Sequence, residues 1–277
     1  MNMLLWSTDV SAASYEPVFE RLSRMGFDGV EIPIFDREAD KYAELGRRLG
    51  ALGLERLAVS ARGETENPVT ADPKVRANAV AATKANVDSA AALGAPLLCG
   101  PLGAPIGVFT GAGPTADEKA RAVDYLREVA PYAEERGVTI ALEYLSRFEM
   151  YLTNTAADLA ALVREVGHAR VRMMYDTFHA HIEEKDPREA LRACADVLVH
   201  VHASENDRGT PGAGQVDWDA TFAGLREIGY DGWIVIEAFG DALPDLAAAT
   251  KIWRRTFESE EQLARDGLAF LRSRLAA

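Results

Sequence analysis

The sequence is poor in cysteine and in positive charge, and each shortage excludes a class of protein. Cys99 and Cys194 are the two cysteines among 277 residues, and neither belongs to a CxxC pair. A disulfide framework is therefore not expected. We expect two reduced, largely buried thiols in a cytoplasmic protein instead. Lys and Arg number 30 against 43 Asp and Glu, which gives a net charge of -13. Such an acidic chain is a poor partner for nucleic acid or an anionic membrane.

Long apolar runs are also missing. Residues 1–9 lack the basic region and the apolar stretch of a signal peptide, so none is expected. No uninterrupted apolar run approaches the length needed to span a bilayer, and no membrane partner is expected. A GxGxxG motif is absent after the first expected strand, where residues 6–10 are Trp-Ser-Thr-Asp-Val. This absence disfavours an open nucleotide-binding sheet.

What the sequence does contain is a regular alternation of short apolar runs with helical patterns, separated by Gly. The apolar runs predict strands at residues 2–6, 27–32, 54–59, 95–99, 138–143, 171–176, 197–202 and 232–237. Helices are expected at 15–25, 38–50, 73–93, 115–136, 154–166, from about 187, at 218–228 and over about 243–275. Repeated strand–helix units favour a parallel sheet, and eight of them favour closure. We therefore predict an α/β fold, a (β/α)8 TIM barrel, as a single domain over residues 1–277.

Four of the expected strands end in a residue that can bind a metal. These residues are Glu143, Asp176, His202 and Glu237, spaced about 30 residues apart as in successive strand–helix units. Any one of them alone would be explained equally well by a helix cap or a salt bridge. Because the carboxyl ends of barrel strands meet at one face, four in register predict a single metal site.

Three carboxylates and one imidazole form an oxygen-rich donor set. Such a set suits Mn²⁺, Mg²⁺ or Co²⁺ better than a structural Zn²⁺, which prefers Cys and His. Glu143 and Glu237 come from different sides of the expected barrel. One of these two glutamates can remove a proton next to a carbonyl, and the other can return a proton to the opposite face. That sequence of steps gives an epimer, whereas proton return to a neighbouring carbon gives aldose–ketose isomerisation.

Polar residues on the neighbouring loops fit the recognition of sugar hydroxyls. Glu149, His179 and Arg208 are the candidates. A helix-cap or core histidine, a surface salt bridge of Arg208, and pairing of Glu149 with Arg147 are the structural alternatives. His200 lies on the same strand face as His202, where it can support the site or fill the barrel, and it is not included among the ligands. His181 is at most an outer neighbour of the site.

These residues make the chain resemble the D-tagatose 3-epimerase / D-psicose (D-allulose) 3-epimerase group of ketose 3-epimerases, within the xylose isomerase-like TIM-barrel superfamily. The resemblance covers nearly the whole chain. It is carried by Glu143-Tyr-Leu-Ser-Arg-Phe-Glu149, Asp176-Thr-Phe-His179, the run from His202 to Gly212, Trp233-Ile-Val-Ile-Glu237 and the C-terminal region.

The resemblance implies that Glu143, Asp176, His202 and Glu237 bind one divalent ion, preferably Mn²⁺. It implies further that Glu143 and Glu237 are the acid/base pair, and that Glu149, His179 and Arg208 hold the sugar. The implied enzyme is a cytoplasmic isomerase that epimerises free ketoses such as D-fructose, D-tagatose and L-ribulose at C3. The implied assembly is a homodimer or homotetramer.

The chain also departs from the family pattern. The usual Glu-Pro-Leu-Asn-Arg is Glu143-Tyr-Leu-Ser-Arg147, and a usual Gly-x-Gly-His is Gly212-Ala-Gly-Gln215. Gly103 and Ala104 stand where His or Ser is frequent. Such loops shape the far end of a sugar pocket, so the sequence predicts the chemistry better than it predicts the sugar.

Other functions on the same scaffold stay open. A hydroxypyruvate or aldose–ketose isomerase, or an inosose dehydratase-like lyase, would use the same metal and glutamates. A DNA-repair endonuclease would need a multi-metal cluster with more histidines, and five His with a charge of -13 disfavour it. A barrel that only binds a sugar would not need both Glu143 and Glu237.

Overall fold

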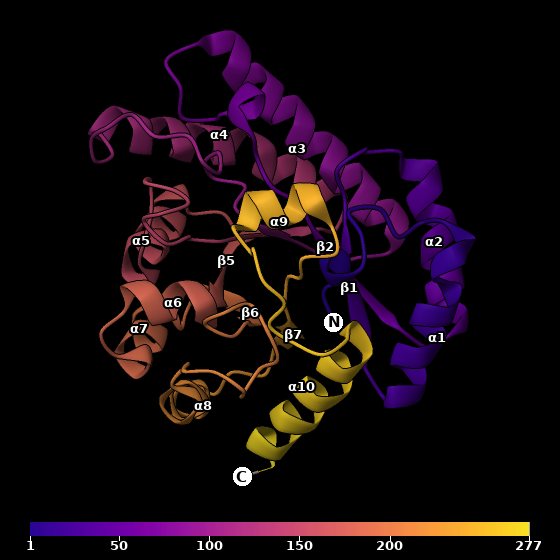
Figure 1. Cartoon of the computed structure of the whole chain (residues 1–277). Helices are drawn as coiled ribbons and strands as arrows, with labels where there is room; N and C mark the ends of the chain where they lie inside the picture. Colours follow the sequence, from indigo (N-terminus) through magenta and orange to yellow (C-terminus); the bar gives the residue numbers. More distant parts are fainter. Residues whose placement is uncertain (277) are drawn as a thin grey trace.

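The computed structural model describes residues 1–276 and contains one parallel sheet in the order β1-β2-β3-β4-β5-β6-β7. The strands are β1 Gly29–Pro33, β2 Glu55–Val59, β3 Leu97–Gly100, β4 Thr139–Leu142, β5 Val171–Asp176, β6 Leu198–Ala203 and β7 Trp233–Ile236. The sheet curls into a nearly closed barrel with the helices around it (Figure 1). The predicted single-domain TIM barrel is therefore confirmed, although the predicted boundary at residue 277 lies outside the described residues.

The predicted first strand at residues 2–6 is wrong. Met3–Leu5 forms a 3₁₀ turn, and Asn2 alone makes a parallel bridge, to Glu31. The cause is local, because the Asn2 side chain accepts a hydrogen bond from the Leu4 backbone N–H at 2.8 Å and so starts a helical turn. Two residues nevertheless bridge the first and the last strand. The Asn2 N–H donates to the Ile236 carbonyl of β7, and the Glu31 N–H of β1 donates to the Met1 carbonyl, each at 2.9 Å.

Ten α-helices pack around the sheet within the described residues. They are α1 Glu16–Met25, α2 Ala39–Ala51, α3 Pro73–Leu93, α4 Ala116–Glu135, α5 Ala156–Val166, α6 Thr177–Glu183, α7 Pro187–Cys194, α8 Trp218–Glu227, α9 Pro244–Thr250 and α10 Glu260–Leu275. The expected start signals hold. Asp72 caps α3 ahead of Pro73, and Thr115 with Glu118 forms a capping box at α4.

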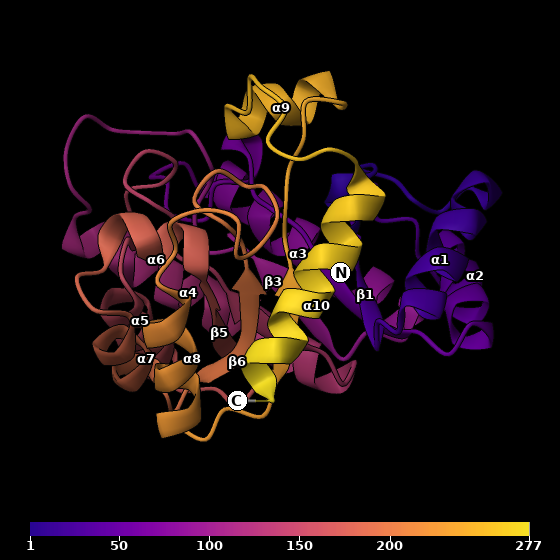
Figure 2. The same cartoon turned by 60° about the horizontal axis from the view of Figure 1, so that its bottom comes forward.

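Two helix predictions need correction. The helix α6 was not expected, and it forms because the Asp176 side chain accepts from the Phe178 N–H at 2.6 Å and caps it. The single helix expected over 243–275 is two helices. Lys251 has a left-handed backbone with φ 62°, which ends α9, and Ser259 caps the start of α10. Figure 2 shows α9 beyond the end to which the strands point, and α10 alongside the barrel.

Apolar side chains separate into two clusters, because successive strand residues face opposite sides of the sheet. The smaller cluster fills the barrel interior and includes Leu57, Cys99, Met174 and Val235. The larger one lies between the sheet and the helices and includes Leu98 and Val201. Both Cys99 and Cys194 are free and buried, as expected. Within residues 1–276 no helix is both long and apolar enough to cross a membrane.

Candidate metal centre and active site

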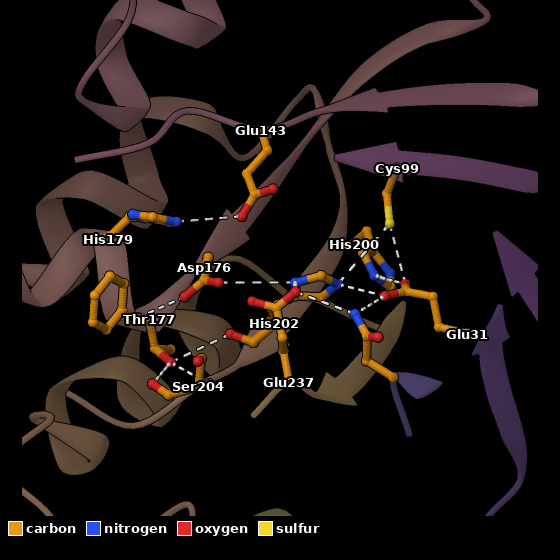
Figure 3. A network of polar contacts seen from close by, with 12 residues as sticks. Glu31, Cys99, Glu143, Asp176, Thr177, His179, His200, His202, Ser204 and Glu237 are labelled. Carbon is orange, nitrogen blue, oxygen red and sulfur yellow. Dashed lines mark hydrogen bonds and ion pairs between the residues drawn. The ribbon is translucent and has the colours of Figure 1, made fainter. Parts of the chain in front are cut away.

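The structure brings the four predicted metal ligands together at one end of the barrel. Glu143 follows β4, Asp176 ends β5, His202 lies in β6 and Glu237 follows β7. Because these four strands are neighbours in the sheet, one ligand atom of each lies within 4.8 Å of the others. All four side chains are buried. Figure 3 shows them pointing toward a common centre.

The donor set fits a divalent cation. His202 turns its Nδ1 atom toward this centre, 3.2 Å from Glu237 Oε1 and 3.8 Å from Asp176 Oδ2. This buried Nδ1 atom has no hydrogen-bond partner, so it is available as a metal ligand. Burial lowers the pKa of His202, but the charges of Glu31 and Glu237 outweigh burial and raise it well above its usual range. A site that attracts a proton so strongly attracts a metal ion for the same electrostatic reason, and the ion displaces the proton.

The surroundings of Glu143 and Glu237 shift the pKa values of these two glutamates in opposite directions. Burial, together with the charges of Glu237 and Asp176, raises the pKa of Glu143 well above its usual range. Burial also acts to raise the pKa of Glu237, but the nearby charges of His202 and Arg208 outweigh it and lower this pKa to about 2. Asp176 lies between these limits, with a pKa that burial and the charge of Glu237 raise to about 7. A pair of carboxyl groups whose pKa values diverge is suited to act as an acid and a base.

Arg208 lies inside the same cluster. Its Nη1 atom donates to Glu237 Oε2 at 2.7 Å and to Asp176 Oδ2 at 3.1 Å, and its guanidinium centre lies 3.7 Å from the centroid of the Phe178 ring. The exposed-salt-bridge alternative for Arg208 is therefore wrong. Arg208 also has a left-handed backbone, with φ 60°. That conformation is uncommon for a side chain other than Gly and requires support from its surroundings.

The loop of Arg208 receives this support from Glu205. This fully buried carboxylate accepts four hydrogen bonds at 2.8–3.1 Å, from the backbone N–H groups of Asn206, Gly212 and Val216 and from the indole Nε1 of Trp218. The loop is thus organised around the buried side chain of Glu205.

Gln215, one of the departures from the family pattern, is exposed, and its backbone N–H donates to Asn206 at 2.7 Å.

His179 faces the centre from α6. Its Nδ1 accepts a hydrogen bond from the Ser146 backbone N–H at 3.0 Å, so the ring carries its proton on Nε2. This Nε2 lies 3.7 Å from Glu143 Oε1. Burial lowers the pKa of His179 well below its usual range, and the charge of Arg208 adds to this effect. His179 is therefore neutral, and its Nε2 lies between Glu143 Oε1 and the Nη2 atom of Arg208, which is 3.1 Å away, whereas His181 on the same helix is exposed.

Glu149 lies at the edge of the site. Its side chain is half-buried, and burial raises its pKa, while the charge of Arg208 opposes the rise. The Glu149–Arg147 pair considered as an alternative does not form, because Arg147 pairs with Glu183 at 2.8 Å.

The Tyr144 ring is buried in the larger apolar cluster, where it packs edge-on against Tyr175 with ring centroids 6.3 Å apart.

A second polar group, which was not predicted from the sequence, lies beside the first. Glu31, Cys99, His200 and His202 place one ligand atom each within 4.8 Å of the others. His202 belongs to both groups, with Nε2 2.8 Å from Glu31 Oε1 (Figure 3). Burial acts to raise the pKa of Glu31, but the charges of His202 and His200 outweigh it and lower this pKa well below its usual range. The available signal was a charged residue within the apolar run Gly29–Pro33.

Comparison with known proteins shows that the chain is similar to sugar epimerases. Residues 19–274 match the model of the xylose isomerase-like TIM barrel family. The chain is 30% identical to the L-ribulose 3-epimerase of Methylomonas sp., over 99% of this chain and 96% of that protein. It is 31% identical to the D-psicose 3-epimerase of Agrobacterium fabrum, over 94% and 93%. A crystal structure of D-allulose 3-epimerase from Methylomonas sp. superposes with a TM-score of 0.93 at 30% identity, covering 99% and 96% of the two chains.

Proposed function

Since the chain belongs to the xylose isomerase-like TIM barrel family, and relatives of nearly its full length are ketose 3-epimerases, we propose that it epimerises free ketoses at C3. It is an enzyme of the isomerase class. The observation that carries the proposal is the set Glu143, Asp176, His202 and Glu237, in which two glutamates flank one cation-binding centre. D-fructose, D-tagatose and L-ribulose are the substrates to be tested.

The proposed catalytic pair is Glu143 and Glu237. An ionised Glu237 removes the proton from C3, and a protonated Glu143 delivers one to the opposite face of the resulting cis-enediolate. The directions of their pKa shifts support these roles for one direction of the reaction, and the roles exchange in the other. A divalent cation held by the four donors supplies polarisation of the ketose carbonyl, and Mn²⁺ is the proposed ion.

Three further residues would hold the sugar. The His179 Nε2–H can donate to a sugar oxygen next to Glu143, because its Nδ1 is already engaged by the Ser146 backbone. Arg208 presents a guanidinium fixed by Asp176 and Glu237, which suits the carbonyl end. Glu149, half-buried at the edge, can accept from a hydroxyl group.

Incubation with each ketose and Mn²⁺, followed by chromatography, tests the proposal. We expect the C3 epimer of at least one ketose, with one deuteron incorporated at C3 in D₂O. Formation of aldoses alone would identify an aldose–ketose isomerase, and loss of water would identify a lyase of the inosose dehydratase kind. Hydroxypyruvate is included to test that isomerase activity. Absence of solvent exchange into any bound ketose would leave a sugar-binding protein.

Two accompanying properties are proposed. A homodimer or homotetramer is proposed from the resemblance to the epimerase group, and light scattering on the purified protein measures the mass directly. A reducing, cytoplasmic location is proposed because Cys99 and Cys194 are both free.

A further inference from the structure

Glu31 occupies an unusual position for a carboxylate. It lies in the middle of β1 and is fully buried. Its neighbours Val30 and Ile32 face the outer apolar cluster, so Glu31 points into the barrel, beside the proposed metal centre. An isolated charge in such a place is very costly, and it is retained only where partners surround it.

Four partners converge on this carboxylate. Oε1 lies 2.8 Å from His202 Nε2 and accepts from Asn2 Nδ2 at 2.9 Å. Oε2 lies 2.8 Å from His200 Nε2 and accepts from Cys99 Sγ at 3.1 Å. Oε1 therefore has two hydrogen-bonding partners, and Oε2 has one hydrogen bond and one close contact, so the carboxylate cannot rotate without breaking contacts.

The contact with His202 decides which ring nitrogen faces the cation. Since Glu31 engages Nε2, a proton stays on Nε2, and Nδ1 is directed toward Glu237 and Asp176. A metal-binding histidine commonly donates its other N–H to a carboxylate, which fixes the ring and makes the ligand nitrogen more basic.

Asn2 extends this control to Glu237. Its Nδ2 donates both to Glu31 Oε1 and, at 3.1 Å, to Glu237 Oε1. The amide cannot turn over, because its Oδ1 accepts from the Leu4 backbone N–H. The same amide group therefore ties one oxygen of a proposed catalytic glutamate to the carboxylate beside it.

We propose that Glu31 is a positioning residue of the metal centre, which orients His202 directly and Glu237 through Asn2. This rests on the proposed function only in that the four donors above bind a cation. It adds a carboxylate that touches neither the cation nor the sugar. The competing arrangement is a second cation held by Glu31, Cys99, His200 and His202 themselves, and the experiments below separate the two.

The first experiment needs no variant. Protein labelled with ¹⁵N-histidine is loaded with diamagnetic Zn²⁺ and studied by NMR. We expect His202 to carry a proton on Nε2 and to bind the metal through Nδ1. A proton on Nδ1, or metal bound at Nε2, would overturn the proposal.

The second experiment measures Mn²⁺ binding by calorimetry in the absence of sugar. Removal of such a carboxylate typically weakens metal binding about 10- to 100-fold, and Glu31→Gln is expected to do so because glutamine offers one acceptor oxygen in place of two. Asn2→Ala is expected to give a smaller loss. Cys194→Ala removes a buried thiol that belongs to neither group and is the matched control, with a Kd within about twofold of the parent. Should Glu31→Gln fail to fold, Asn2→Ala and the NMR measurement still decide.

Unchanged Mn²⁺ affinity in both Glu31→Gln and Asn2→Ala would overturn the proposal. So would a second equivalent of Mn²⁺ that Cys99→Ala abolishes. Failure of the proposed function is distinguishable, because a chain that binds Mn²⁺ with Nδ1 of His202 but epimerises no ketose refutes the activity and leaves the role of Glu31 intact.

Discussion

The backbone N–H of Ser146, and not its side chain, donates the hydrogen bond that fixes His179. Ser146 stands where the epimerase pattern usually has Asn. The Ser146 hydroxyl is buried without a hydrogen-bond partner. The contact with His179 is therefore independent of the side chain at position 146, provided that the loop keeps its path.

The first prediction concerns that unpartnered hydroxyl. Ser146→Ala removes a buried polar atom that has no partner, which costs little and can stabilise a protein. We expect kcat/KM for the preferred ketose within about twofold of the parent, and a melting temperature that is equal or higher. A tenfold fall in kcat/KM would show instead that the hydroxyl contacts the sugar.

The second prediction concerns the donor on His179. His179→Asn removes the Nε2–H that faces Glu143, and a lost hydrogen bond to a charged or strongly polar group costs about 1.5–3 kcal/mol. We expect kcat/KM to fall roughly 10- to 150-fold, with a higher KM. The matched control is His181→Asn, which changes an exposed histidine on the same helix and is expected to leave the kinetics unaltered.

The third prediction concerns the catalytic pair. Glu237→Gln removes the carboxylate proposed to exchange protons with C3, and the expected loss of kcat is at least about 100-fold. Deuterium exchange into the ketose is expected to fall in parallel, even where some metal binding survives. Glu227→Gln changes an exposed glutamate on α8 in the same way and is the control for the substitution itself. Full activity of Glu237→Gln would remove this residue from catalysis.

The fourth prediction concerns the anion inside the loop of Arg208. Glu205→Ala leaves four donors unpaired, and truncating such a buried charged network typically costs about 3–5 kcal/mol of unfolding free energy. Urea denaturation measures this loss. Asp207→Ala in the same loop removes one hydrogen bond, from the Gly209 N–H, and we expect about 0.5–1.5 kcal/mol. Equal losses in the two variants would contradict the role assigned to Glu205.

The fifth prediction concerns metal removal. A ligand that binds the folded state alone stabilises it by about 2.7 kcal/mol when present at 100 times its Kd. A chelator is therefore expected to lower the melting temperature of the parent, and added Mn²⁺ to restore it. Asp176→Ala is expected to respond to neither. A parent protein whose melting temperature ignores both chelator and Mn²⁺ would contradict a resident cation.

The sequence was most informative where chemistry and strand periodicity coincide. Apolar runs that end in Glu143, Asp176, His202 and Glu237 predicted both the strands and their convergence, because parallel strands in a barrel share one carboxyl-end face. It was less informative where a residue has two roles. Asp176 was identified as a ligand, with a helix cap as the alternative, and the structure shows that it also caps the unexpected helix α6.

The remaining misses have physical causes in long-range contacts. Glu31 is stabilised by His202, 171 positions away, and no local pattern contains that information. The apolar run at residues 2–6 satisfies a strand pattern, but the Asn2 side chain starts a 3₁₀ turn, and the Asn2 backbone makes only an isolated bridge to Glu31. The break at Lys251 contains neither Gly nor Pro, so the usual signals for a helix end were missing.

The hydrogen bond between Asn2 and Glu237 spans 235 positions, and it has a consequence for the order of folding. Contacts between such distant residues carry a large loop-closure cost and form after the local strand–helix units. During synthesis, β7 emerges after most of the barrel. Asn2 can therefore form its hydrogen bond with Glu237 only after almost the whole chain has been made. The Asn2–Glu237 hydrogen bond therefore forms only once the two ends of the chain have met.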